Sequence, residues 1–141
     1  GASRADVVMS NDTIYYPKPM GLDLLLALTQ EACDQYFPNL RENGTLIIDS
    51  DLVHQPPTPV CYAFPFTQLA KSEIGHVMVA NVISLGAIVE LTSLASKEGV
   101  KKVVRSRAPM GTEEKNLKAL ELGFEIAREA KKKQGKPAVS A

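Results

Sequence analysis

The chain has 141 residues, of which 45% are apolar and 23% charged, so it suits one folded domain with a single hydrophobic core. Sixteen Lys and Arg residues balance sixteen Asp and Glu residues. A neutral domain lacks the positive field that holds a phosphate backbone, so we expect no nucleic acid as a partner.

The two cysteines, Cys33 and Cys61, do not stand in the CxxC spacing that opens a zinc or iron–sulfur site. We expect this chain to hold no metal, and we expect both thiols to be reduced and to pack as small hydrophobic groups, although a disulfide between them stays open. Residues 1–6 show no basic and apolar signal segment, which favours a cytoplasmic protein. Because the chain begins without Met, we also expect processing, a tag remnant or a lost preceding segment.

Two short extended segments open the sequence. Residues 5–10 (ADVVMS) are β-branched and bounded by polar residues, which predicts a strand that leads into a turn at Asn11 and Asp12. Residues 13–16 predict a second extended piece.

A strand, a helix and a strand follow in that order. Residues 22–28 (LDLLLAL) are the continuous apolar run of a buried parallel strand, and Thr29 can cap a helix over residues 29–37. Residues 44–50 (GTLIIDS) predict the next strand, with Asn43-Gly44 as the turn before it. This order indicates a βαβ unit.

The middle of the chain predicts one more strand and a short helix. Residues 54–59 (HQPPTP) form a loop that prolines hold extended, and residues 60–64 follow as a strand. A helix then starts at Pro65, with Thr67 as its cap and Gly75 at its C-terminal end. Strands that alternate with helices predict a three-layer α/β/α architecture around a mostly parallel, Rossmann-like sheet.

Residues 77–94 form the most apolar segment and approach the length of a membrane span. Polar side chains within the segment, Asn81 and Glu90 among them, argue against a membrane location, so we expect no membrane as a partner. Gly86 and Ala87 permit close backbone approach. We therefore interpret the segment as a buried helix that covers the sheet or is shared with another subunit.

Two amphipathic helices complete the predicted fold. Ser96 caps the first, over residues 97–107, and the second covers residues 112–133, with acidic residues in its first turn and lysines in its last. The valines of the first helix that we expect to face inward are Val100, Val103 and Val104. We assign residues 1–133 to one α/β domain and residues 134–141 to a flexible tail.

Few residues suggest chemistry. Asp49 and Asp51 follow a predicted parallel strand, at the edge where open α/β sheets bind ligands, and would hold a metal or orient a hydroxyl; the alternative, favoured by turn preferences, is that they cap the turn. Asn81 would present its amide to a ligand or partner, and the favoured alternative is a core amide bonded to a nearby loop. His54 and His76 lack any accompanying nucleophile signature, so we expect no catalytic triad.

Residues 97–107 contain five basic side chains, which are candidates for binding the phosphate groups of a nucleotide-like ligand. A solvated helix face is the default interpretation of such a charge run and is favoured. The given residues contain no P-loop and no GxGxxG motif, so they do not indicate nucleotide binding by a glycine-rich loop.

Several segments, taken in order, resemble the gamma subunit, or the corresponding domain, of the 2-oxoacid:ferredoxin oxidoreductases that act on pyruvate, 2-ketoisovalerate or 2-oxoglutarate. The segments are Gly1-Ala2-Ser3-Arg4-Ala5-Asp6-Val7, LDLLLALTQEACDQY, GTLIIDSDLV, VANVISLGAI and NLKALELGFEIA. Each is weak alone, and together they are fairly specific. Members of this family begin earlier, with a strand and a helix that carry a GxGGxG turn, so we expect the sheet here to lack its first strand and helix.

The resemblance implies a non-redox subunit of a complex that decarboxylates a 2-oxoacid to an acyl-CoA and passes electrons to ferredoxin. It implies that thiamine diphosphate and iron–sulfur clusters are bound by other subunits, the thiamine-binding and cluster-binding chains, and that coenzyme A is a substrate. By the same resemblance, Ser3 and Arg4 lie nearest the shared site. The alternative for Arg4 is an ion pair with an acidic neighbour at the sheet edge.

Two other functions stay open from the sequence. The basic segment 97–107 favours a stand-alone nucleotide or acyl-CoA binding α/β module. The apolar segment 77–94 favours a structural homo-oligomer, which would form when the chain is isolated. The sequence does not identify the 2-oxoacid.

Overall fold

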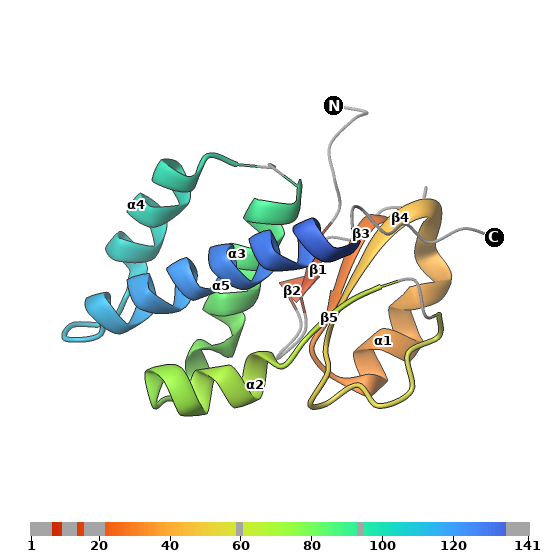
Figure 1. Ribbon diagram of the computed structural model, residues 1–141, viewed down its shortest axis with the longest axis horizontal. Helices are drawn as coiled ribbons and strands as arrows, with labels where there is room; N and C mark the ends of the chain where they lie inside the picture. The colour runs from red at the N-terminus through yellow and green to blue at the C-terminus, as the bar shows by residue number, and fades with distance from the viewer. Residues whose placement is uncertain (1–6, 10–13, 16–21, 59–60, 93–94, 135–141) are drawn as a thin grey trace. The chain divides into compact units, whose positions relative to one another are not determined.

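The computed structural model describes residues 7–9, 14–15, 22–58, 61–92 and 95–134. These residues form two compact parts: a sheet part that ends at Pro65 and a helical part that begins at Phe66 (Figure 1). The predicted turn at Asn11 and Asp12 and residues 135–141 of the predicted tail lie outside the described residues, whereas Gln134, the first residue of that tail, is the last residue of a helix. The assignment of residues 1–133 to one domain stays a prediction.

The sheet part holds five strands in the order β2-β1-β3-β4-β5. The strands are β1 (Val7–Met9), β2 (Ile14–Tyr15), β3 (Leu22–Ala27), β4 (Leu40–Asp49) and β5 (Tyr62–Phe64). Strands β1, β3, β4 and β5 run parallel, and β2 pairs antiparallel with β1 at one edge. The predicted α/β class and the mostly parallel sheet are therefore confirmed, whereas the three-layer arrangement and the missing first strand stay predictions.

The predicted βαβ unit is present as β3, α1 (Gln30–Tyr36) and β4, with β3 and β4 paired in parallel (Figure 1). Thr29 is the N-cap of α1, because its Oγ1 accepts a hydrogen bond from the backbone N–H of Ala32 at 3.2 Å. Helix α1 ends at Tyr36 and is followed by a short 3-10 turn over Phe37–Asn39, which contains Pro38.

The core of the sheet part lies between α1 and one face of the sheet. Leu25 of β3 pairs in register with Leu46 of β4, and Ala27 pairs with Ile48, so all four side chains share a face with Cys33 of α1. Each large aliphatic side chain buried in this way stabilises the fold by about 1.5–3 kcal/mol. Burial of these residues fixes the register of β3 against β4.

The prediction of a turn at Asn43-Gly44 is wrong, because β4 begins at Leu40 and runs through both residues. The register explains the difference: Leu22 pairs with Leu40, whereas Leu24 pairs with Thr45. Two steps along β3 thus match five along β4, an irregularity of the kind that a bulge produces and that an Asn-Gly pair tolerates. The Asn-Gly pair, which is a local signal for a chain reversal, therefore lies inside one long strand.

The helical part consists of three main helices and a shorter lead-in (Figure 1). The elements are α2 (Phe66–Leu69), a π-helical turn (Ala70–Ile74), a 3-10 turn (Val77–Val79), α3 (Ala80–Thr92), α4 (Lys97–Arg107) and α5 (Glu113–Gln134). Thr67 is not the cap of α2, because the helix begins at Phe66, directly after Pro65, and Thr67 lies in its first turn. Gly75 ends this segment with φ +85°, as predicted for a left-handed C-terminal residue.

Helix α3 packs against α5 through a contact between two glycines. A Cβ atom added to Gly123 of α5 would clash with the carbonyl oxygen of Ile83 and lie 2.9 Å from the Cα of Gly86. The close approach expected at Gly86 is confirmed, and within the helical part its partner is α5. Within the described residues, no helix combines the length and apolar character that crossing a membrane requires.

Helix α4 packs on α5 through Val100 and Val104, which are buried with Leu120 and Phe124 of α5. Ser96 caps α4 as predicted, since its Oγ accepts a hydrogen bond from the N–H of Gly99 at 3.0 Å. The inward placement of Val103 is wrong, because this side chain is 51% exposed. Val100 and Val104 lie four residues apart in one row along the helix, and Val103 lies to the side of that row, outside the buried cluster.

We predict that Gly123→Ala destabilises the protein by about 3 kcal/mol, because the added methyl group meets backbone atoms that cannot rotate away. Alanine would otherwise favour the helix by about 1 kcal/mol. Chemical denaturation measures the difference, with Glu125→Ala on the exposed face of α5 as the matched control. Equal stability of the two variants would show that the helices do not touch at this point.

Candidate functional site

The first candidate site lies at the carboxyl end of β4, where Asp49 is fully buried. Its Oδ1 accepts a hydrogen bond from the backbone N–H of Asp51 at 2.9 Å, and its carbonyl oxygen accepts from the N–H of Val53 at 2.8 Å. Asp49 therefore caps the turn after β4, which is the alternative that turn preferences favour. A ligand role for Asp49 and Asp51 stays a prediction.

Gln30 ties the loop after β4 to the first turn of α1. Its Nε2 donates to the carbonyl oxygen of Gln55 at 2.8 Å, and its Oε1 accepts from the N–H of Gln55 at 2.9 Å. The same Nε2 also lies 2.9 Å from Oδ1 of Asp34. Because β3 and β4 are parallel, α1 starts at the edge where β4 ends, and this clamp lies at the edge of the sheet where the parallel strands end.

The cysteines are free thiols that take part in the core of the sheet part. Burial, and then the negative charges of Asp34 and Cys61, raise the pKa of Cys33 to about 11. Burial also raises the pKa of Cys61. At neutral pH both thiols are protonated, so they behave as the small hydrophobic groups that the sequence predicts.

Asn81 lies in the first turn of α3, in the helical part. Its Oδ1 is buried and accepts no hydrogen bond from the described residues. The favoured alternative, a core amide bonded to a nearby loop, is therefore not seen for this atom. Presentation of the amide to a ligand or partner stays a prediction.

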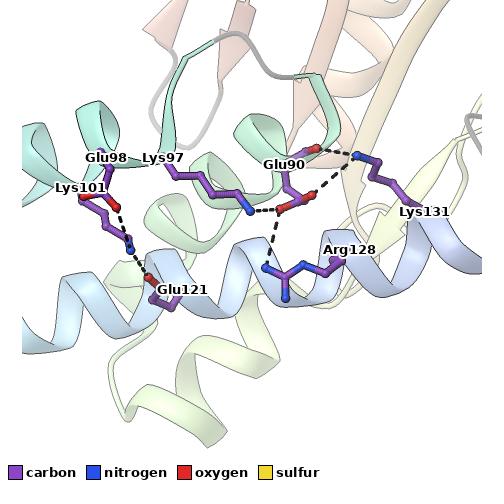
Figure 2. Close-up of polar contacts among 7 residues, drawn as sticks. All are labelled: Glu90, Lys97, Glu98, Lys101, Glu121, Arg128 and Lys131. Carbon is purple, nitrogen blue, oxygen red and sulfur yellow. Dashed lines mark hydrogen bonds and ion pairs between the residues drawn. The ribbon is translucent and has the colours of Figure 1, made fainter.

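A cluster of charged side chains joins the three main helices around Glu90 of α3 (Figure 2). Glu90 Oε1 lies 2.6 Å from Nζ of Lys97, the first residue of α4, and 3.9 Å from Arg128 of α5. Its Oε2 lies 3.7 Å from Nζ of Lys131, which also donates to the carbonyl oxygen of Glu90 at 3.1 Å. Lys97 passes over the ring of Phe124, with Nζ 5.1 Å from the ring centroid.

The Glu90 cluster is held by ion pairs and by a hydrogen bond to a carbonyl group in the last turn of α3. Burial by itself would raise the pKa of Glu90, but the short ion pair with Lys97 and the positive charges of Lys131 and Arg128 outweigh it and hold the pKa below its ordinary value of 4.5. Lys131 bonds to a carbonyl group in the last turn of α3, where carbonyl groups lack partners within the helix.

The basic side chains of α4 mostly serve contacts within the helical part. Lys101 Nζ lies 2.8 Å from Glu121 of α5, and Arg105 lies 3.2 Å from Glu113. With Lys97 bound to Glu90, these are three of the five cations that were candidates for binding phosphate. The arrangement therefore favours a structural role for α4 over a phosphate site.

Ser3 and Arg4, the residues that the resemblance places nearest the shared site, lie outside the described residues. Their roles stay predictions. Among the residues that the structure does describe, no group of three or more His, Cys, Asp or Glu side chains is arranged to hold a metal ion.

Comparison with known proteins identifies the family. The sequence model of the family "Pyruvate ferredoxin/flavodoxin oxidoreductase" matches residues 1–126. The 2-oxoglutarate synthase subunit KorC of Methanocaldococcus jannaschii is 41% identical over 133 residues, which cover 92% of this chain and 71% of that protein. The chain belongs to the pyruvate ferredoxin/flavodoxin oxidoreductase family. KorC of Methanothermobacter marburgensis is 35% identical over 140 residues, covering 94% of this chain and 75% of that protein.

A solved structure from the same oxidoreductase family supports both the fold and the subunit type. The gamma subunit of a keto/oxoacid ferredoxin oxidoreductase from Geobacter sulfurreducens PCA is 47% identical, with a TM-score of 0.74. The match covers 77% of this chain and 65% of that chain, so the present sequence spans slightly less than two thirds of the solved subunit. The resemblance to gamma subunits, which the sequence segments predict, is confirmed.

Sequence reasoning missed the two best-defined polar arrangements of this oxidoreductase chain. Gln30 and Gln55 are 25 residues apart, and Lys131 is 41 residues from Glu90. Spacing along a sequence reveals only pairs three or four residues apart on a helix. The one available signal was Glu90 itself, a carboxylate in an otherwise apolar helix that requires a positive partner.

We predict that Gln30→Ala loosens the loop after β4 in this oxidoreductase chain, because two hydrogen bonds to the backbone of Gln55 are lost at a cost of about 1 kcal/mol. Hydrogen exchange at the N–H of Gln55 should become faster. The control is Gln35→Ala, an exposed residue of α1. If the N–H of Gln55 exchanges at the same rate in the two variants, the clamp does not hold the loop.

We predict that Glu90→Gln lowers stability at neutral pH by about 1 kcal/mol, because the ion pairs of a mostly covered carboxylate are lost. Since the folded pKa of Glu90 lies below 4.5, its contribution is present above that pH and disappears as the pH falls through the folded value. Thermal melting curves of the wild type and the variant should therefore converge in acid. Glu125→Gln, an exposed change on α5, is the control, and a constant gap at all pH values would contradict the assignment.

Proposed function

We propose that this chain is the non-redox gamma subunit of a 2-oxoacid:ferredoxin oxidoreductase complex whose substrate is 2-oxoglutarate. In this reaction the bond between the carboxylate carbon and the keto carbon breaks, carbon dioxide leaves, and the acyl group forms a thioester with coenzyme A. The two electrons released pass to ferredoxin. The products are succinyl-CoA, carbon dioxide, the proton of the thiol and reduced ferredoxin.

The observation that carries the proposal is the similarity to 2-oxoglutarate synthase subunits. The KorC proteins of two methanogens are 41% and 35% identical to this chain over nearly its whole length. The family model alone, whose description names pyruvate, does not distinguish between 2-oxoacids. The names of these relatives support 2-oxoglutarate as the substrate.

The redox chemistry belongs to other chains of the proposed complex. An iron–sulfur cluster needs four ligands of the cysteine type, whereas this sequence has two cysteines, and burial keeps both thiols protonated. These residues do not fit a cluster, so we assign the clusters and thiamine diphosphate to cluster-binding and thiamine-binding partner chains. Ferredoxin would receive electrons through those chains, in the cytoplasm.

The role left to this chain is to shape the complex. Asp49 and Asp51 lie at the edge of the sheet where α/β proteins bind ligands, and Asn81 holds a buried acceptor that the described residues leave unbonded. We propose that these residues, with Ser3 and Arg4, lie next to the substrate or a neighbouring subunit. Whether coenzyme A touches this chain is part of the same proposal.

The stand-alone nucleotide or acyl-CoA module is not favoured. The basic residues of α4 that suggested it are largely engaged by the acidic side chains of Glu90, Glu121 and Glu113. The homo-oligomer of the isolated chain stays a prediction.

The test is purification of the native complex through a tag on this chain. We expect thiamine- and cluster-binding chains to co-purify and coenzyme A-dependent dye reduction to be faster with 2-oxoglutarate than with pyruvate or 2-ketoisovalerate, by about tenfold or more in kcat/KM. The full chain alone, which should show no turnover, is the control. A preference for pyruvate would contradict the substrate assignment, and the absence of partner chains would contradict the subunit role.

A further inference from the structure

The cluster around Glu90 contains more positive charge than its carboxylate neutralises. Lys97, Arg128 and Lys131 lie within 4 Å of one carboxylate, so three positive charges against one negative charge leave a surplus of two. Only Lys97, at 2.6 Å, is within hydrogen-bond distance of the carboxylate. Arg128 at 3.9 Å and Lys131 at 3.7 Å are attracted by its charge without a hydrogen bond to it.

Arg128 and Lys131 therefore keep donors available. A guanidinium group has five N–H donors, and the described residues offer Arg128 no ion pair other than the long one to Glu90. Lys131 uses one of its three donors on the carbonyl oxygen of Glu90. We call Lys97, Arg128 and Lys131 the α4–α5 cationic patch.

The patch is exposed and its counter-charge is covered. The side chains of Lys97, Arg128 and Lys131 are 44%, 51% and 44% exposed, whereas that of Glu90 is 11% exposed. Figure 2 shows Lys97 reaching from α4, and Arg128 and Lys131 from α5, toward the same carboxylate. Glu90 is thus a covered counter-charge beside three exposed cations.

We infer that the α4–α5 cationic patch docks an acidic surface of another subunit of the complex. A small phosphate ligand needs a concave site that covers most of its surface, whereas these donors are about half exposed on two helices, α4 and α5. A nucleic acid needs a wide positive field, which a chain of zero net charge does not supply. A protein surface that carries carboxylates needs neither a concave site nor a wide positive field. The inference rests on the proposed function, because it requires partner chains.

The inference predicts opposite effects from two changes in one cluster. Removing the cations of Arg128 and Lys131 lowers the surplus charge and should weaken the docking. Removing the charge of Glu90 raises the surplus from two to three and should strengthen it, although both changes cost stability. A purely structural cluster would give effects of the same sign.

The experiment measures binding of the full chain to the partner subunits, purified from the native complex without this chain, at low and high salt. We expect Arg128→Gln with Lys131→Gln to raise Kd about tenfold at low salt and to flatten its salt dependence, and Glu90→Gln to lower Kd about threefold. Lys102→Gln, an exposed cation of α4 outside the patch, is the matched control and should leave Kd unchanged. Thermal melting confirms that each variant is folded at the assay temperature.

Several outcomes would overturn the inference while leaving the proposed function intact. One is an unchanged Kd in the double variant, and another is weaker binding in Glu90→Gln as well. A third is release of the partner by coenzyme A together with loss of coenzyme A binding in the double variant, which would assign the patch to a phosphate ligand. If the wild-type chain finds no partner at all, the proposed function fails and the inference fails with it.

Discussion

The helical part depends on how closely the backbones of α3 and α5 approach each other. Gly86 and Gly123 meet where neither helix has a side chain, and any Cβ atom at Gly123 would overlap backbone atoms of α3. This approach places the end of α3 beside the second half of α5, so that Lys131 reaches both the carboxylate and the carbonyl oxygen of Glu90. The ion pairs are a consequence of the helix contact, since charged side chains in water stabilise an arrangement weakly and cannot impose it.

The pattern of the sequence was sufficient for the elements whose signals are local. Neighbouring residues alone predict the apolar strand β3, the caps at Thr29 and Ser96 and the helix end at Gly75, and the structure confirms them. Asn43-Gly44 shows the limit of such signals, because a turn preference was outweighed by pairing of Leu40 with Leu22. Pairing between strands is decided by residues distant in the sequence.

The candidate sites were less predictable than the fold for the same reason. Asp49 is predictable because the end of a parallel strand has a known place in an α/β sheet, but its hydrogen bond from the N–H of Asp51 depends on the path of the turn, which the sequence does not define. The Glu90 cluster draws its members from three helices, and no spacing rule joins Glu90 to Lys131. The family, by contrast, was recognisable from several segments that follow one another in the same order as in the family. Each position is weakly informative, but the similarity adds up over many positions.

The Gln30 clamp uses only the backbone of the residue it holds. Both hydrogen bonds end on the N–H and the carbonyl group of Gln55, and neither involves the glutamine side chain at that position. The loop after β4 is therefore free to exchange its side chains without detaching from α1, provided that position 55 keeps its N–H and so is not proline. Related subunits would be able to vary the chemical surface of this loop while its path over the sheet edge is inherited unchanged.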